Sequence, residues 1–77
     1  MKICVSNHAF DRYRQRINRN QHGSLMPMFV QAMAHGTRYN GKDGTFVMHY
    51  HGVDYICKND NRAVTQVLTV YPNAARD

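Results

Sequence analysis

The segment TFVMHYHGVDYICK, residues 45–58, decides the fold class of this chain. Two runs rich in β-branched and aromatic residues, 45–50 and 53–58, flank the dipeptide His51-Gly52. Runs of this composition predict strands, and a two-residue connection that contains glycine predicts a tight antiparallel hairpin between them. We therefore expect a β-hairpin in the middle of the second half of the chain.

The sequence on both sides of this hairpin extends the predicted sheet. Residues 59–61 (Asn-Asp-Asn) are typical of a turn, and residues 62–71 form the longest β-type run. Residues 37–39 form a further short run before two glycine-containing turns. We expect antiparallel β structure over residues 37–72 and a tail over residues 73–77. Strict alternation along the last strand predicts Val64, Leu68 and Val70 on one face, and Thr65, Val67, Thr69 and Tyr71 on the other.

The first half of the sequence has a predominantly helical pattern. Residues 8–18 place their apolar side chains on one arc of a helix, and residues 6–7 (Ser-Asn) supply capping side chains before it. Residues 25–35 form a second helix, for which Gly36 is the expected left-handed C-terminal residue. The β-branched run at residues 1–5 predicts a first or edge strand.

Together these elements predict a single α+β domain that spans residues 1–77. Residues 1–36 are the mainly helical half with its short first strand, and residues 37–72 are the β half. A chain of 77 residues is too short for a second hydrophobic core. We expect two N-terminal helices packed on an antiparallel sheet of three or four strands.

Length and composition exclude a multidomain enzyme, a nucleotide-binding βαβαβ fold and a membrane protein, and they indicate a polyanionic partner. Lys and Arg total 10 against 5 acidic residues, all of them Asp, so the formal net charge is +5. No stretch is long and apolar enough for a membrane span, and the N-terminal residues do not resemble a signal peptide. Cys4 and Cys57 favour two free thiols over a disulfide. We expect a cytoplasmic protein that binds nucleic acid rather than a membrane.

The strongest candidate for chemistry lies on the first predicted helix. His8, Arg12 and Arg16 are spaced by four residues and form one stripe along it, with Arg14 and Arg19 nearby in the sequence. Arginine matches the geometry of phosphate oxygens, and a helix N-terminus also favours an anion. Metal-free RNA cleavage requires a base for the 2′-OH and cations for the phosphorane. The alternative is a solvated polar face whose arginine stems shield the core.

Two weaker candidates lie in the β half. His49 and His51 could bind a metal together, but no third ligand clusters with them in the sequence. Either could instead be a second acid/base or an ordinary residue of the hairpin. Aromatic rings on a sheet face can stack unpaired bases, and the β half carries Tyr39, Tyr50, Tyr55 and Tyr71. We predict no metal site and no cofactor.

Several short motifs together resemble a known family. They are residues 6–9 (Ser-Asn-His-Ala), Arg12, residues 16–17 (Arg-Ile), the helix end at 34–36 (Ala-His-Gly) and the final strand at 67–71 (Val-Leu-Thr-Val-Tyr). This pattern resembles a family of small RelE-like domains and, more widely, the barnase–colicin–RelE ribonuclease superfamily that includes RelE and BrnT toxins. The resemblance spans nearly the whole chain. It implies two N-terminal helices against a four-stranded antiparallel sheet, and RNA cleavage without a metal.

The resemblance also implies roles for individual residues. His8 would be the catalytic acid/base, Arg12 and Arg16 would hold the scissile phosphate, and Tyr71 or Thr69 on the last strand would line the catalytic site. Further contacts with RNA are expected from Arg14, Arg19, Lys58 and Thr69. The lysine-rich ribosome-binding surface of some RelE toxins has no counterpart here, because the chain has only three lysines.

We therefore expect a RelE-like, metal-independent endoribonuclease that acts as a toxin or phage effector. Its partner would be RNA, free or ribosome-associated, and an antitoxin or a host protein would be a second partner. The alternative belongs to another class: a non-catalytic inhibitory protein that binds a host protein or nucleic acid through its basic face. The small size and the lack of a second securely placed acid/base motivate this alternative.

Overall fold

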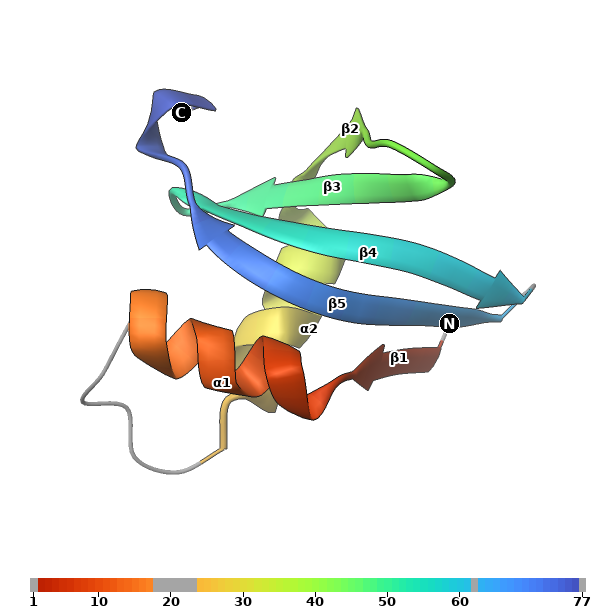
Figure 1. The fold of residues 1–77 in the computed structure, drawn as a ribbon, viewed down its shortest axis with the longest axis horizontal. Coiled ribbons are helices and arrows are strands. Elements are labelled where there is room, and N and C mark those ends of the chain that lie inside the picture. Colours follow the sequence, from red (N-terminus) through yellow and green to blue (C-terminus); the bar gives the residue numbers. More distant parts are fainter. Residues whose placement is uncertain (1, 18–23, 62, 77) are drawn as a thin grey trace.

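A five-stranded sheet with two helices packed on it accounts for most of the described chain (Figure 1). The computed structural model describes residues 2–17, 24–61 and 63–76. In chain order the elements are β1 (Lys2–Val5), α1 (Asn7–Arg16), α2 (Met26–His35), β2 (Thr37–Asn40), β3 (Thr45–Tyr50), β4 (Val53–Asn61), β5 (Val64–Pro72) and a 3-10 turn, η1 (Ala74–Arg76). The predicted α+β class is confirmed. Neither of the two α-helices in the described ranges, each ten residues long, has the length or hydropathy to cross a bilayer.

The sheet differs from the prediction in the number and direction of its strands. Its order is β1-β5-β4-β3-β2, so it has five strands rather than three or four. β1 runs parallel to β5, with Lys2 opposite Val64 and Val5 opposite Val67, while the other neighbours are antiparallel. The prediction of a purely antiparallel sheet is therefore wrong. The first and last strands pair across almost the whole chain, and no local pattern encodes such a pairing.

The β3–β4 hairpin confirms the prediction from residues 45–58. Its turn is His51-Gly52, and both residues have positive φ values of 48° and 75°. Two positive φ values are what a tight hairpin turn with the correct twist requires. The predicted turn at residues 59–61 is wrong, because β4 continues through Asn61 with an irregularity in its pairing to β5.

A β-bulge changes which residues of β5 face the helices. Cys57 pairs with Val67 while the preceding residue of β4, Ile56, pairs with Thr69, so Leu68 is an extra residue in β5. A bulge shifts the alternation of side chains by one position. As a result Val67 and Val70 are both fully buried in the core, and the strict alternation that separated them is wrong.

Helix α1 lies along the edge of β5 that β1 leaves open (Figure 1). Ser6 makes the junction: its hydroxyl accepts a hydrogen bond from the Ala9 amide at 3.0 Å, which caps the helix as predicted, and donates one to the Leu68 carbonyl at 3.1 Å. The Ser6 amide donates to the Val67 carbonyl at 3.2 Å. These bonds satisfy backbone groups that an open strand edge would leave exposed.

Gly36 ends α2, but not in the predicted left-handed conformation. Its φ and ψ are −71° and 167°, which is extended backbone. A Cβ atom at this position would lie 2.9 Å from the carbonyl oxygen of His49 and closer still to that of Ala32. Glycine is therefore needed here because the chain passes close to β3.

The core joins both helices to one face of the sheet through a cluster of aromatic rings. Phe29 of α2 is fully buried, and its ring centroid lies 5.3 Å from Phe10, 5.6 Å from Tyr13 and 5.4 Å from Tyr55. Such distances are typical of favourable edge-to-face and tilted pairs. Phe29 thus contacts α1 and β4 at once.

Both cysteines are free, as predicted. Cys4 is half-buried on β1, and Cys57 is fully buried on β4. Burial raises the pKa of the Cys57 thiol to about 12, since a thiolate is poorly solvated in the core. Cys57 therefore belongs to the packing of the core.

Truncating Phe29 should remove the contact that holds the two helices and the sheet together. We expect Phe29→Ala to lower the free energy of unfolding by about 3–5 kcal/mol, the range found for buried phenylalanines. Val30 follows it on α2 and is 42% exposed, so Val30→Ala is the matched control and should cost less than about 0.5 kcal/mol. Urea unfolding followed by circular dichroism measures both. Equal effects of the two substitutions would contradict this assignment of the core.

Candidate functional site

The stripe predicted on the first helix begins with a direct contact between His8 and Arg12. Arg12 Nε donates a hydrogen bond to His8 Nε2 at 3.3 Å, and Arg12 Nη1 donates to Gln15 Oε1 at 2.9 Å. All three residues lie on α1, three or four positions apart, where helix geometry makes side chains neighbours. His8 is solvent-exposed and Gln15 orients the Arg12 guanidinium, so imidazole and guanidinium can meet the same ligand.

The other end of the stripe is anchored to β5. Arg16 Nη1 donates to the Val70 carbonyl at 3.0 Å, and the Arg16 guanidinium carbon lies 4.6 Å from the centroid of the Tyr71 ring. Tyr71 remains 46% exposed despite this stacking. The structure therefore brings together Arg16 and Tyr71, two of the predicted catalytic residues that lie far apart in the sequence.

The stripe consists of two neighbouring pairs rather than one tight cluster. His8 and Arg16 are eight residues apart on α1, a distance of about 12 Å along the helix axis. Arg12 lies between them, one turn from each. His8 with Arg12 and Arg16 with Tyr71 can contact adjacent parts of one extended ligand.

Two further predicted RNA contacts lie away from both pairs. Arg14 is two positions from Arg12 and from Arg16, so a rotation of about 200° places it on the opposite side of α1. Lys58 is exposed on β4 and pairs with Gln66, about 15 Å along the strand from Tyr71. Neither side chain extends the stripe.

Of the last two predicted contacts, Thr69 adds nothing accessible to the stripe. The Thr69 hydroxyl is buried and has no hydrogen-bond partner among the described residues. Arg19 lies outside the described residues. Of the predicted site residues that the structure describes, His8, Arg12, Arg16 and Tyr71 therefore make up the stripe and its contact on β5.

A second polar cluster, which the sequence did not predict, lies around Asp54. His49 Nδ1 is 2.7 Å from Asp54 Oδ1, and Asp54 Oδ2 accepts hydrogen bonds from Asn73 Nδ2 at 2.8 Å and Arg76 Nε at 3.0 Å. His49 and Asp54 are only 7% and 6% exposed. The predicted tail thus folds back as η1 and makes side-chain contacts with β4.

The pairing of the strands places this cluster on the sheet face opposite the helices. One cross-strand row runs Thr37, His49, Asp54 and Tyr71, and the next runs Tyr39, Val47, Ile56 and Thr69. Residues one position along from these, such as Phe46 and Met48, belong to the core under the helices. Tyr71 therefore links the stripe on α1 to the second face of the sheet. By contrast, Tyr55 lies in the core, so the four tyrosines do not form one stacking surface.

Part of this second cluster was implicit in the predicted hairpin. A two-residue turn at His51-Gly52 pairs residue 49 with residue 54, which makes His49 and Asp54 direct neighbours. His51 itself lies in the turn, and its ring packs against Tyr50 at 4.1 Å between centroids. Within the described ranges, no three His, Cys, Asp or Glu side chains are grouped so as to hold a metal ion. No sequence signal linked Asn73 or Arg76 to this cluster.

The hydrogen bonds to Asp54 outweigh the cost of burying its charge. Burial alone would raise the pKa of this carboxyl group. Hydrogen bonds from Asn73, His49 and Arg76, together with the Arg76 charge, lower the pKa of Asp54 below its ordinary value instead. Asp54 is therefore ionised at neutral pH and holds its three partners in place.

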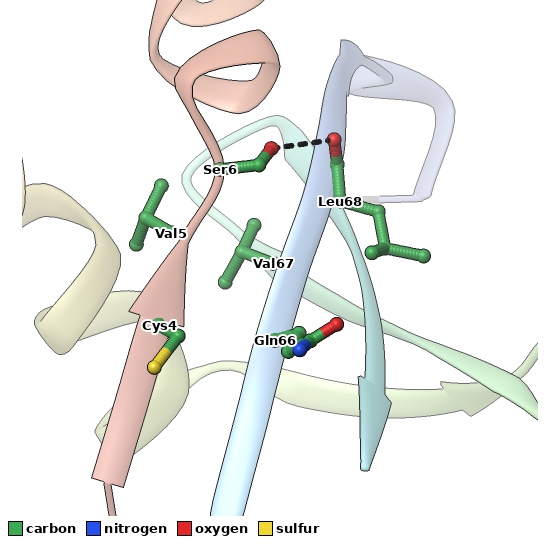
Figure 2. Close-up of a pocket in the computed structure, with 6 residues that line it drawn as sticks. All are labelled: Cys4, Val5, Ser6, Gln66, Val67 and Leu68. Atoms are coloured by element: carbon green, nitrogen blue, oxygen red, sulfur yellow. Dashed lines mark hydrogen bonds between the residues drawn. The ribbon is translucent and has the colours of Figure 1, made fainter. Parts of the chain in front are cut away.

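A hollow of about 190 Å³ lies between β1 and β5 (Figure 2). The Ser6–Leu68 hydrogen bond spans the two chain segments at one end of it. The residues that line the hollow include no charged side chain: Cys4, Val5, Ser6, Gln66, Val67 and Leu68. It therefore lacks the cations that a phosphate ligand requires, whereas the stripe on α1 has them.

Comparisons of this chain with protein-family models, with curated proteins and with solved structures found no significant match. The resemblance to RelE-like domains thus rests on the sequence motifs.

Replacing the Asp54 carboxylate should destabilise the protein in a pH-dependent way. We expect Asp54→Asn to lower the free energy of unfolding by about 1.5–3 kcal/mol at pH 7, the range for hydrogen bonds to charged groups. The folded pKa lies below the unfolded one, so the ionised carboxylate stabilises the fold above the ordinary Asp pKa. This contribution disappears as the pH falls through the lowered value. The difference in free energy of unfolding between wild type and Asp54→Asn should therefore decrease on acidification below about pH 4.

Urea unfolding at a series of pH values measures this difference in the free energy of unfolding. Asp60 is exposed and accepts a hydrogen bond from Gln66, so Asp60→Asn is the control and should change stability by less than about 0.5 kcal/mol. A difference between wild type and Asp54→Asn that stays constant down to strong acid would contradict the proposed charge at Asp54.

Proposed function

We propose that this chain is a RelE-like, metal-independent endoribonuclease that binds RNA along the stripe on α1. The contact between His8 Nε2 and Arg12 Nε, at 3.3 Å, carries this proposal. A base and a phosphate-binding cation at this separation suit the 2′-OH and the adjacent phosphate of one RNA linkage. The net charge of +5 supports a polyanionic ligand.

The proposed reaction starts when a phosphate oxygen takes over the hydrogen bond from Arg12 Nε. This frees Nε2 of His8 to accept the proton of the 2′-OH. The 2′-oxygen then bonds to phosphorus, and the Arg12 guanidinium stabilises the negative charge that develops on the phosphorane oxygens. The bond between phosphorus and the 5′-oxygen breaks, and the leaving oxygen takes a proton from the His8 imidazolium or from water. The products are a 2′,3′-cyclic phosphate and a 5′-hydroxyl.

Arg16 and Tyr71 hold the neighbouring part of the RNA in this proposal. Arg16 lies about 12 Å along α1 from His8, and Tyr71 of β5 stacks on Arg16, so we assign Tyr71 to the neighbouring part of the RNA rather than to proton transfer beside His8. The half-exposed Tyr71 ring can stack an unpaired base instead, a contact worth about 1–3 kcal/mol. Arg16, already held by the Val70 carbonyl, presents its remaining N–H groups to the next phosphate.

A toxin or phage effector is the cellular role that the resemblance to RelE-like domains supports. Such a protein would act in the cytoplasm on free or ribosome-associated RNA. An antitoxin or a host protein would then be its second partner.

A non-catalytic RNA-binding or inhibitory protein is the second candidate. One observation favours it: the lone pair of His8 Nε2 already accepts a hydrogen bond from Arg12, so the base is engaged before any ligand binds. In that case His8 would only orient Arg12. The two candidates differ in what His8→Ala does to bound RNA.

Substitutions on α1 test the proposed nuclease directly. We expect His8→Ala to slow cleavage of end-labelled RNA by about 10²–10⁴-fold in the presence of EDTA, the usual contribution of a general base, while binding changes little. Arg12→Ala should weaken binding and reduce its salt dependence by about 0.7 in the log–log slope, the value for one phosphate contact on a single strand. Arg14 lies on the opposite side of α1, so Arg14→Ala is the matched control for charge.

Gel analysis of the products and titration at several salt concentrations give both readouts. Cleavage that is unchanged by His8→Ala would remove the proposed base. Stable binding of intact RNA by wild type, with no cleavage product, would replace the nuclease by the second candidate.

A further inference from the structure

The C-terminal segment, residues 73–76, covers part of the sheet face that the helices leave open. The Asn73 amide donates to the Gly52 carbonyl at 2.8 Å, and Asp54 accepts hydrogen bonds from the side chains of Asn73 and Arg76. Figure 1 shows this segment beside the β3–β4 turn.

The covered region includes the ring of Tyr39. The Arg76 guanidinium carbon lies 4.3 Å from the centroid of this ring, so the guanidinium stacks on one face of it. The same guanidinium is held by the salt bridge to Asp54, at 3.0 Å. The contact on Tyr39 is therefore tied to the buried carboxylate and, through Asp54, to the rest of the C-terminal segment.

We propose that Tyr39 is a second stacking site for an unpaired RNA base, and that residues 73–76 are a latch that closes over it. The inference rests on the RNA binding proposed above. Tyr39 and Tyr71 lie on the same face, on strands three positions apart and in neighbouring cross-strand rows, which separates them by about 16 Å. A single-stranded RNA that leaves the stripe at Tyr71 can cross this face of the sheet and reach Tyr39 once the latch opens.

A base and the Arg76 guanidinium compete for the same surface of Tyr39. Both are planar groups that stack on aromatic rings, so only one can occupy that face. When a base displaces the Arg76 guanidinium from Tyr39, the N–H groups of that guanidinium become available to phosphates of the RNA backbone. A latch that is open in about one molecule in ten would weaken the measured affinity about tenfold, since only the open fraction binds.

Removing the latch should therefore tighten RNA binding, whereas removing a positive charge elsewhere should weaken it. We expect Arg76→Gln to tighten binding of a short fluorescein-labelled 2′-O-methyl oligoadenylate about tenfold, measured by fluorescence anisotropy. The 2′-O-methyl groups prevent 2′-OH attack, so binding is measured without cleavage. Lys42 is exposed in the β2–β3 loop, and Lys42→Gln removes the same charge but should weaken binding. In the Arg76→Gln background, Tyr39→Ala should abolish the gain.

A second variant opens the latch without changing the net charge. Asn73→Ala removes one hydrogen bond to Asp54 and should tighten binding by a smaller factor, which keeps the test decisive if Arg76→Gln does not fold. Circular dichroism verifies folding of each variant. Weaker binding by folded Arg76→Gln, equal to that of Lys42→Gln, would overturn the latch. A gain that persists without Tyr39 would overturn the stacking site.

The outcomes separate this inference from the nuclease proposal. Tighter binding by Arg76→Gln, with no cleavage of ordinary RNA by any variant, would keep the latch and remove the nuclease. His8-dependent cleavage with no gain for Arg76→Gln or Asn73→Ala would keep the nuclease and remove the latch. No binding of the oligonucleotide by wild type or by the opened variants would overturn the latch as well as the stripe.

Discussion

The packing of Phe29 against Phe10, Tyr13 and Tyr55 is the interaction on which the rest of the structure depends. It joins α1, α2 and β4 in a protein too small to have a second cluster of comparable size. Because this packing holds one side of α1 against the core, His8, Arg12 and Arg16 are left on its outer flank. The orientation of the cationic stripe is thus a consequence of how α1 buries its aromatic residues.

Local patterns predicted those parts of the fold that depend on neighbours in the sequence. The β3–β4 hairpin follows from the His51-Gly52 turn, and the contact between His8 and Arg12 follows from their spacing on a helix. The same hairpin also implied the pair of His49 and Asp54, because the turn alone sets the register. The stripe and half of the second cluster were therefore within reach of sequence reasoning.

The features that sequence reasoning missed depend on residues far apart in the chain. The parallel pairing of β1 with β5, the bulge at Leu68 and the return of Arg76 to Asp54 have no local signature. A bulge depends on how a strand pairs with its neighbour. A C-terminal segment of small and polar residues has the composition of a tail, and its contact with the buried Asp54 carboxylate depends on the tertiary structure. The contact between Arg16 and Tyr71 was implied only by the resemblance to RelE-like domains, which assigned both residues to one site.

The junction at Ser6 also has a consequence for the order in which the protein folds. Ser6 and Leu68, joined by a hydrogen bond, are 62 residues apart, and Arg16 and Val70 are 54 apart. Contacts of such long sequence separation form late, because a large loop must close before they stabilise anything. During synthesis, helix α1 leaves the ribosome well before its docking strand exists. The cationic stripe on α1 is therefore assembled only after β5 has been made, so partly synthesised chains would carry the cations without their anchored arrangement.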